Sequence, residues 1–271
     1  MAEPAVILHT DEVIAALPYP RTRRTLRWHL AQFARVVTVS LLEFRTAWPY
    51  LIVFGCLVPL GLIFWMSRMG GEFSRERAVF ILGGNLVTSI VYGPVIGMVG
   101  KIGWGKEHRT FDYWAGLPLP KLAWVLATVT VYLLLALPSV AIIFGVGALT
   151  LGIPLVNGLA LIPLIPLGTL SMVGLGAFLG ILAPNGQTAS LFGNAMIGVV
   201  TFLTPTLLPL EQMPTVMQWI ARVLPMTYAA DAFRLALSGE LGAPLALDIG
   251  ILVLSSLGFL WVLSKRLDFR G

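Results

Sequence analysis

The chain has 271 residues, of which 57% are hydrophobic and only 11% are charged, with a mean hydropathy of +0.87. Soluble domains carry about 45–50% apolar and about 25% charged residues, so this composition excludes a water-soluble globule. The net charge of +5 and the pI near 9.7 could suggest a nucleic-acid partner, but the basic residues are split among segments that flank apolar runs. Several runs reach the ~20 residues of a transmembrane helix, which predicts an all-α polytopic membrane protein.

The N-terminal 46 residues are rich in arginine. They hold no compact apolar core ending in a small-residue cleavage site, so we expect no signal peptide and an uncleaved first span. Residues 1–23 are expected to form a loosely ordered cytoplasmic N-terminus. Residues 24–46 predict an amphipathic helix in the headgroup plane, with packing on protein as the alternative. Its apolar side chains recur at steps of three or four, namely Leu26, Leu30, Phe33, Val37, Leu41 and Phe44.

Six apolar runs follow within residues 47–265, separated by short polar or Pro/Gly-rich breaks. Between residues 122 and 210 the sequence has no Asp, Glu, Lys, Arg or His, and Pro, Gly and Asn divide this block into three. Tryptophan and tyrosine near the ends of the first run favour the membrane interface. The predicted spans are 47–66, 78–99, 122–149, 161–182, 190–208 and 245–263, followed by a tail at 266–271.

The segment 209–240 differs from the spans because charged residues interrupt its apolar ones. It is too polar to cross the bilayer and too apolar for a simple loop, so we expect re-entrant helices that are shielded by protein. Asp231 and Arg234 lie three residues apart and could pair on one helical face. An exit gate or a dimer contact is the functional alternative for this pair.

The distribution of Lys and Arg predicts the topology. Six spans place both termini on one side, and the N-terminal segment, the 101–121 loop and the tail on that side carry thirteen of the 18 basic residues. The positive-inside rule makes this side cytoplasmic, and we expect a bacterial plasma (inner) membrane. The other side carries five, namely Arg68, Arg75, Arg77, Arg222 and Arg234.

The 101–121 loop holds the densest charge cluster in the middle of the chain. Residues 100–106 match G-x-x-x-x-G-K, but Glu107 replaces the Ser or Thr of a P-loop and would repel phosphates. No strand precedes the motif either, so we expect no ATP binding here. Residues 105–116 instead predict a short helix with aromatic anchors and a rim of charge, which is typical of a docking surface. An interfacial helix with Trp114 among the headgroups is the alternative.

Three stretches resemble the membrane-spanning subunits of bacterial type 2 ABC transporters, the ABC-2 type export permeases. They are KEHRTFDYWAGLPLPK, FLTPTLLPLEQMP and LPMTYAADAFR. The likeness covers about residues 25–265, with departures at Arg109 and Pro205, where the family commonly has Gly. The matching positions are Glu107, Thr110, Asp112 and Pro118, then Pro209, Met213 and Pro214, then Pro225, Thr227, Tyr228, Asp231 and Arg234.

The resemblance implies two six-span permease subunits, as a homodimer or a paralogous heterodimer, each docked on a separate ABC ATPase. Residues 24–46 would be the elbow helix. ATP and Mg would bind to the ATPase, so this chain would hold no cofactor and catalyse no reaction. The implied outward re-entrant or gate residues are Pro225, Thr227, Tyr228, Asp231 and Arg234. The implied docking residues of the coupling helix are Lys106, Glu107, Arg109, Thr110, Phe111, Asp112, Tyr113 and Trp114.

The implied function is ATP-driven export, and the charge-free block favours an amphipathic or hydrophobic substrate, drug-like or lipid-like. Export of a polysaccharide or a lipid-linked glycan is the second candidate. An ion-coupled secondary transporter would place ionisable residues within the membrane, and the third to fifth spans have none. A membrane hydrolase or metal site is not expected, because the histidines lie outside the spans and Cys56 is the lone cysteine. Polar candidates for the path are Thr128, Thr130, Ser139, Thr169, Ser171 and Asn194.

Overall fold

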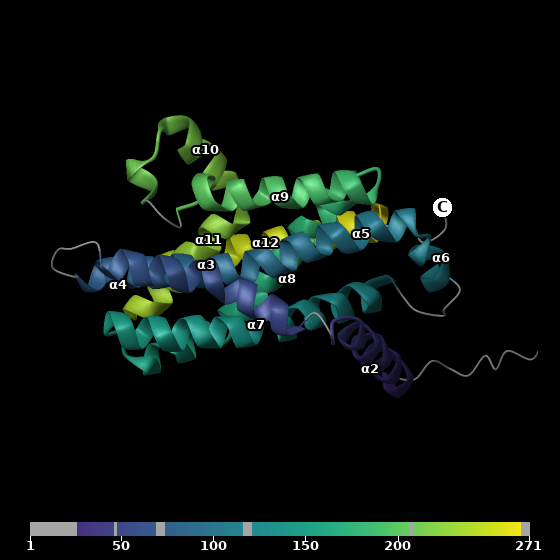
Figure 1. Cartoon of the computed structure of the whole chain (residues 1–271), viewed down its shortest axis with the longest axis horizontal. Helices are drawn as coiled ribbons and strands as arrows, with labels where there is room; N and C mark the ends of the chain where they lie inside the picture. The colour runs from purple at the N-terminus through teal and green to yellow at the C-terminus, as the bar shows by residue number, and fades with distance from the viewer. Residues whose placement is uncertain (1–25, 46–47, 69–73, 116–120, 206–208, 267–271) are drawn as a thin grey trace, which may run out of the picture.

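The computed structural model describes residues 26–45, 48–68, 74–115, 121–205 and 209–266. These residues form an elongated helical bundle without a strand (Figure 1). The predicted N-terminal segment 1–23 and the last five residues of the tail lie outside the described residues. The longer helices are α2 (Leu26–Glu43), α3 (Trp48–Arg68), α4 (Arg75–Val91), α5 (Gly97–Glu107), α7 (Lys121–Leu151), α8 (Leu164–Leu182), α9 (Gly186–Leu203), α11 (Pro225–Ser238) and α12 (Ala243–Arg266).

Short helical elements connect or terminate the longer helices. A π-helix joins α4 to α5, and a single-turn α6 follows α5 at one end of the bundle. At the opposite end, two 3₁₀ segments and α10 lie near the ends of the longer helices (Figure 1). Their bounds are η1 (Tyr92–Ile96), α6 (Thr110–Ala115), η2 (Leu155–Leu161), η3 (Leu210–Gln212) and α10 (Thr215–Val223).

Five helices among the described residues are long and apolar enough to cross a membrane. They correspond to the first, second, third, fourth and sixth predicted spans. The fifth predicted span, 190–208, corresponds to α9, which begins earlier and is not among the five. The sequence of α9 includes Gln187 and Asn194, which lower its hydropathy. A bundle of six spans therefore stays a prediction, although α9 runs along the others (Figure 1).

The second span is longer than the sequence predicted. The segment α4–η1–α5 forms one helical rod of 33 residues, about 50 Å at 1.5 Å per residue, whereas a bilayer core is ~30 Å thick. Pro94 lacks the N–H of a regular helix, and the wider π turn of η1 accommodates it. Residues 100–106 are helical within α5, which is a different geometry from the phosphate-binding turn of a P-loop.

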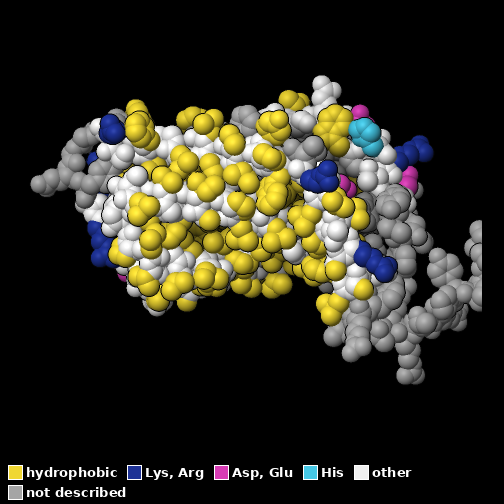
Figure 2. All heavy atoms as spheres, turned by 60° about the horizontal axis from the view of Figure 1, so that its bottom comes forward, with side chains coloured by type: hydrophobic (Ala, Val, Ile, Leu, Met, Phe, Trp, Pro, Cys, Tyr) yellow, Lys and Arg dark blue, Asp and Glu magenta, His cyan; other side chains and the backbone are white. Residues whose placement is uncertain are grey.

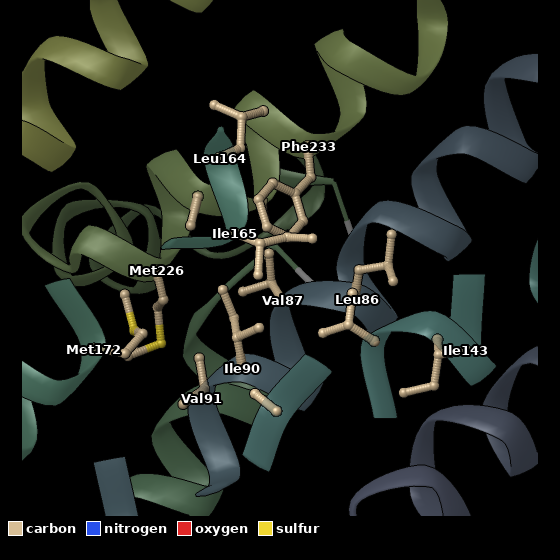
Figure 3. Packing of buried hydrophobic residues seen from close by; sticks show 14 of the residues in the cluster. Leu86, Val87, Ile90, Val91, Ile143, Leu164, Ile165, Met172, Met226 and Phe233 are labelled. Atoms are coloured by element: carbon tan, nitrogen blue, oxygen red, sulfur yellow. The ribbon is translucent and has the colours of Figure 1, made fainter. Parts of the chain in front are cut away.

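The centre of the bundle is packed around α11, which contacts α4, α8, α12 and η2. Met226 lies beside Met172, and Phe233 beside Ile165, with both α11 side chains fully buried (Figure 3). In a bilayer such contacts hold helices together by close van der Waals packing, because lipid tails are as apolar as the side chains. The predicted shielding of the 209–240 segment by protein is thus seen for α11, while its depth in the membrane stays a prediction.

The outside of the bundle carries the apolar surface that the composition demands. On the face in Figure 2, hydrophobic side chains cover the middle of the bundle, and Lys and Arg side chains gather at its two ends. Trp48, Tyr50 and Trp65 are exposed near the ends of α3, where aromatic rings favour the membrane interface. The chain is therefore a multi-pass membrane protein.

The N-terminal helix α2 packs on the bundle through one face. Val36 and Ser40 are buried, and Phe33, Val37 and Phe44 pack around the same cluster beside α7. Leu30 belongs to the predicted apolar stripe but is 58% exposed. Packing on protein, the alternative weighed above, thus accounts for part of this helix, and its place in the headgroup plane stays a prediction.

Candidate functional site

The turn after α5 projects α6 beyond the end of the long rod. The amide of His108 donates to the carbonyl of Trp104 at 2.9 Å, and that of Asp112 to the carbonyl of Arg109 at 3.1 Å. Arg109 has φ 52°, the left-handed region that glycine adopts most easily. This is the position at which the ABC-2 permeases commonly have Gly, so the departure in the sequence falls on a backbone that still requires the glycine-like conformation.

The predicted docking residues do not all face outward. The exposed members are Lys106, Glu107, Arg109, Thr110 and Asp112. Phe111 is 9% exposed and packs edge-on against Trp124, with ring centroids 6.0 Å apart. Phe111 therefore holds α6 on the bundle instead of offering its ring to a partner. The side chains of Tyr113 and Trp114 lie outside the described part of the structure, so their docking role stays a prediction.

Lys106 and Glu107, at the last turn of α5, contact the connection between α8 and α9. The Lys106 ammonium donates to the carbonyls of Gly180, Ile181 and Ala183 at 3.0, 2.7 and 2.8 Å. These carbonyls end α8, where a helix leaves its acceptors unsatisfied and favours a cation. The Glu107 carboxylate accepts from the backbone N–H of Gly186, the first residue of α9, at 3.0 Å, where the helix favours an anion.

Glycine at position 186 makes the second contact possible. A Cβ there would lie 2.5 Å from the Trp104 ring and 2.9 Å from the Glu107 carboxylate. The residue before it, Asn185, caps α9 by accepting from the Thr188 N–H at 2.8 Å. The α8–α9 turn is thus shaped to receive the end of α5.

A second basic residue links α5 to α2. Lys101 lies 3.4 Å from the carboxylate of Glu43 and 3.4 Å from the hydroxyl of Ser40. Its ammonium also stands 5.9 Å from the centroid of the Trp124 ring, a cation–π distance. Helices α2, α5 and α7 therefore meet at this end of the bundle beside α6.

At the opposite end, the predicted gate residues lie on α11 and at its junction with α10. Pro225 is the first residue of α11, where its missing N–H costs nothing. The Thr227 hydroxyl donates to the carbonyl of Ala221 at 2.6 Å, and the Tyr228 hydroxyl to that of Arg222 at 2.7 Å. Both bonds fasten α10 to α11 across the bend between them.

The predicted pairing of Asp231 with Arg234 is confirmed, with an N–O distance of 3.1 Å. Arg234 also donates to the carbonyl of Pro205, after α9, and its guanidinium lies 3.8 Å from the centroid of the Phe80 ring on α4. Burial lowers the pKa of Arg234 to about 10, and Asp231 opposes this shift. Burial likewise raises the pKa of Asp231, against the effect of Arg234. The pair joins three helices, while a gating role stays a prediction.

A cavity of about 440 Å³ opens between α3, η1 and α7, with Ile197 of α9 at its edge. Its lining is almost wholly apolar, and of the predicted path residues only Ser139 lines it. Tyr132 also lines it, and the hydroxyl of this buried tyrosine has no hydrogen-bond partner among the residues that the structure describes. The π-helix forms one wall, and π turns often occur at functional sites.

The other predicted path residues lie elsewhere in the bundle. Thr128 and Thr169 are buried, and the Thr128 hydroxyl donates to the carbonyl of Trp124. Ser171 shares a hydrogen bond with Ser255 of α12, at 2.9 Å, whereas Asn194 is on the surface of α9. Thr130 donates to the carbonyl of Leu126 within α7.

Sequence reasoning gave no role to Asp248, an acidic residue on α12 that is only 7% exposed. The signal was available, because Asp248 is the acidic residue within the last apolar run. Tyr132 was missed for a different reason. The sequence around a tyrosine inside a span does not indicate whether its hydroxyl finds a hydrogen-bond partner among the neighbouring helices. No group of three or more His, Cys, Asp or Glu that could hold a metal occurs among the described residues.

Comparison with known proteins identifies the family. The family model described as ABC-2 type transporter matches residues 37–237, well over half of the chain. The chain belongs to the ABC-2 type transporter family. Nodulation protein J of Rhizobium leguminosarum bv. viciae is 24% identical over 238 residues, covering 85% of each chain. Nodulation protein J of Rhizobium meliloti (strain 1021) is 26% identical over 250 residues, covering 88% of this chain and 90% of its relative.

Membership of the ABC-2 family confirms the resemblance drawn from the three sequence stretches. Members of this family are membrane subunits of transporters, are generally not catalytic themselves, and normally work with a separate ABC ATPase subunit. The matched region extends from the middle of α2 to the end of α11. It therefore includes both ends described above, the α5–α6 end and the α10–α11 end.

Proposed function

We propose that this ABC-2 permease is the membrane subunit of an ATP-driven exporter that moves an amphipathic or hydrophobic molecule out of the cytoplasm. The observation that carries the proposal is α6, a short helix that exposes Asp112 next to the exposed Arg109 and is held just beyond the 33-residue rod, itself one of the candidate spans. A partner that displaces α6 would act directly on a helix that lines the cavity. The α6 end is the cytoplasmic end in this proposal, as the positive-inside count predicts.

The proposed ATPase docks on the exposed part of α6, at Arg109, Thr110 and Asp112, together with the predicted Tyr113 and Trp114. ATP and Mg bind to that partner, and two permease subunits form the complete path. Phe111 supports the docking helix from below through its contact with Trp124. Docking surfaces of this kind concentrate their binding energy in a few residues.

The apolar lining of the cavity supports an amphipathic substrate, drug-like or lipid-like. The polar side chains in the wall are Ser89, Tyr92, Tyr132 and Ser139, and the rest of the lining is made of apolar side chains and glycines. Specificity in such sites comes from a small number of polar groups. The second candidate, export of a polysaccharide or a lipid-linked glycan, predicts a path with many more hydrogen-bonding side chains. The cavity favours the first candidate.

The test is copurification followed by transport. The permease is expressed with a candidate ABC ATPase subunit chosen from the neighbouring reading frames, and the complex is reconstituted in liposomes. Asp112→Arg and Trp114→Ala are expected to lower recovery of the ATPase, whereas Arg222→Ala, at the other end of the bundle, leaves it unchanged. In liposomes where the α6 end of the permease faces outward, added ATP should then drive uptake of a fluorescent lipid probe.

Two results would overturn the proposal. One is movement of solute by the purified permease alone on a salt or pH gradient without nucleotide, which would indicate the ion-coupled class. The other is unchanged ATPase recovery in both docking variants. Transport of a soluble labelled oligosaccharide but not of the lipid probe would instead favour the second candidate.

A further inference from the structure

We propose that Lys106 and Glu107 are positioning residues that transmit a displacement of α6 to the α8–α9 turn, and through α9 to the opposite end of the bundle. This inference rests on the proposed docking of an ATPase at α6. It assigns the two residues to force transmission within the permease instead of to docking itself, because their functional groups face α8 and α9.

The two side chains form a clamp, defined here as the contacts of Lys106 with the end of α8 and of Glu107 with the start of α9. Lys106 contacts three carbonyls between 2.7 and 3.0 Å, and Glu107 contacts the Gly186 amide at 3.0 Å. Because adjacent residues contact the two ends of one turn with opposite charges, a shift of the turn along α5 would lengthen at least one of these contacts. Charged donors and acceptors make the stronger kind of hydrogen bond.

Close helix packing behind the clamp makes the contact stiff. A Cβ at Gly103 would lie 2.1 Å from the Ala189 Cβ on α9, and a Cβ at Gly180 would lie 2.8 Å from the Ile102 Cβ on α5. Backbones this close leave no room for a side chain to absorb a displacement. Packed interiors transmit strain for this reason.

Helix α9 offers a path from the clamp to the other end. It runs beside α5 along the bundle (Figure 1) and ends at Leu203. Two residues further, the carbonyl of Pro205 accepts from Arg234 of α11, which is paired with Asp231. A movement of the α8–α9 turn along the axis of α9 would therefore reach the predicted gate residues through a single helix and a single hydrogen bond.

The first experiment tests the clamp on the permease alone, so it does not depend on the ATPase. The background carries Cys56→Ser, which removes the lone cysteine, and spin labels are placed at Asp112→Cys on α6 and Gln187→Cys at the start of α9. Both positions are exposed. In nanodiscs we expect one narrow distance distribution with the clamp intact and a clearly broader one in Lys106→Met/Glu107→Gln. Equal widths in the two proteins would overturn the proposal.

The second experiment measures coupling in the complete transporter without the labelling mutations. Lys106→Met/Glu107→Gln should still copurify with the ATPase and hydrolyse ATP, but transport per ATP should fall about tenfold, within the range of couplings between protein sites. Lys106→Arg, with Glu107 unchanged, keeps the cation and its donors, so it should retain most of the transport per ATP that the double variant loses. Asp112→Arg is the matched control for docking, and it should lower copurification with the ATPase. In the nanodisc experiment, with the labels moved to Thr110→Cys and Gln187→Cys, Asp112→Arg should leave the distance distribution as narrow as in the protein without it.

The outcomes separate this proposal from the one on which it rests. Failure of the wild-type permease to bind any ATPase would refute the proposed function, and the distances in nanodiscs would still decide whether the clamp exists. Normal transport per ATP in the double variant would refute the positioning role. Loss of copurification in the double variant would also refute it, because Lys106 and Glu107 would then be docking residues.

Discussion

The two ends of the bundle use charged side chains in different ways: Lys106 and Glu107 are exposed residues, whereas the Arg234 side chain is mostly buried. At the α6 end, Lys106 and Glu107 bind backbone groups of other helices, at an α8 carboxyl end and an α9 amino end. At the α10 end, Arg234 pairs with Asp231 on its own helix and reaches one carbonyl beyond α9. The charges at the α6 end bind the termini of two other helices, whereas Arg234 is paired within its own helix and reaches other elements through Pro205 and Phe80.

The largest effect is expected from removing the cation at the α10 end. The Arg234 side chain is only 13% exposed. Arg234→Met would leave Asp231 unpaired and would remove this donor from the Pro205 carbonyl. The Asp231 side chain that remains is 42% exposed, so the loss should be about 2–3 kcal/mol of the free energy of unfolding, at or below the ~3–5 kcal/mol of a fully buried pair. The measurement is SDS-induced unfolding of the reconstituted chain.

Arg222→Met is the matched control for this substitution. The Arg222 guanidinium lies over the exposed Trp219 ring at 5.6 Å, a contact worth about 0.5–1 kcal/mol. Equal losses for the two variants would show that the Asp231–Arg234 pair has no special place in the bundle.

The second prediction concerns the tight packing at the α6 end. Gly103→Ala places a Cβ 2.1 Å from the Ala189 Cβ, and overpacking costs about 1–3 kcal/mol, partly offset by the better helix propensity of Ala. We expect a net loss of about 1–2 kcal/mol by these two terms, measured as above.

Gly100→Ala is the control, because its nearest neighbour atom would lie 3.9 Å away, and it should be neutral or slightly stabilising. Gly103→Ala combined with Ala189→Gly should recover most of the loss. If the pair is no better than Gly103→Ala alone, the contact between α5 and α9 is looser than described.

A smaller effect is expected at the junction of α10 with α11. Thr227→Val removes a buried donor to the carbonyl of Ala221, which costs about 1 kcal/mol. Tyr228→Phe removes an exposed bond to the carbonyl of Arg222, so water can replace it and the loss should be smaller. The reverse order would place the fastening of α10 on Tyr228.

The smallest effect is expected at the turn before α6. Arg109→Gly relieves a left-handed conformation that costs an L-residue about 1–2 kcal/mol, but glycine adds about 0.5–1 kcal/mol of unfolded-chain entropy. The variant should therefore be neutral or stabilised by less than about 1 kcal/mol in the same unfolding measurement.

His108→Gly is the neighbouring control for that turn. His108 has φ −90°, which any residue adopts, so glycine brings only the entropy cost and should destabilise slightly. A loss at Arg109→Gly as large as the loss at His108→Gly would show that the Arg109 side chain contributes to the turn.

Five of the six predicted spans, the helical class and the presence of charged residues at both ends followed from the sequence by itself. Hydropathy and chain length determine which segments can cross a bilayer, and the local pattern around Thr227, Asp231 and Arg234 already predicted an intrahelical pair. The family resemblance also marked position 109 as one where Gly is common. Each of these features depends on residues close together in the chain.

Only the tertiary structure decided which helix each side chain meets. The contacts of Lys106 with Gly180 and of Glu107 with Gly186 join residues 74 and 79 positions apart, and Phe111 turned inward where an exposed docking ring was expected. The sequence shows that one face of a helix is charged or aromatic. Which other helix that face contacts depends on how the helices cross. Close approach through Gly103 and Gly186 set those crossings, and a single sequence carries no record of them.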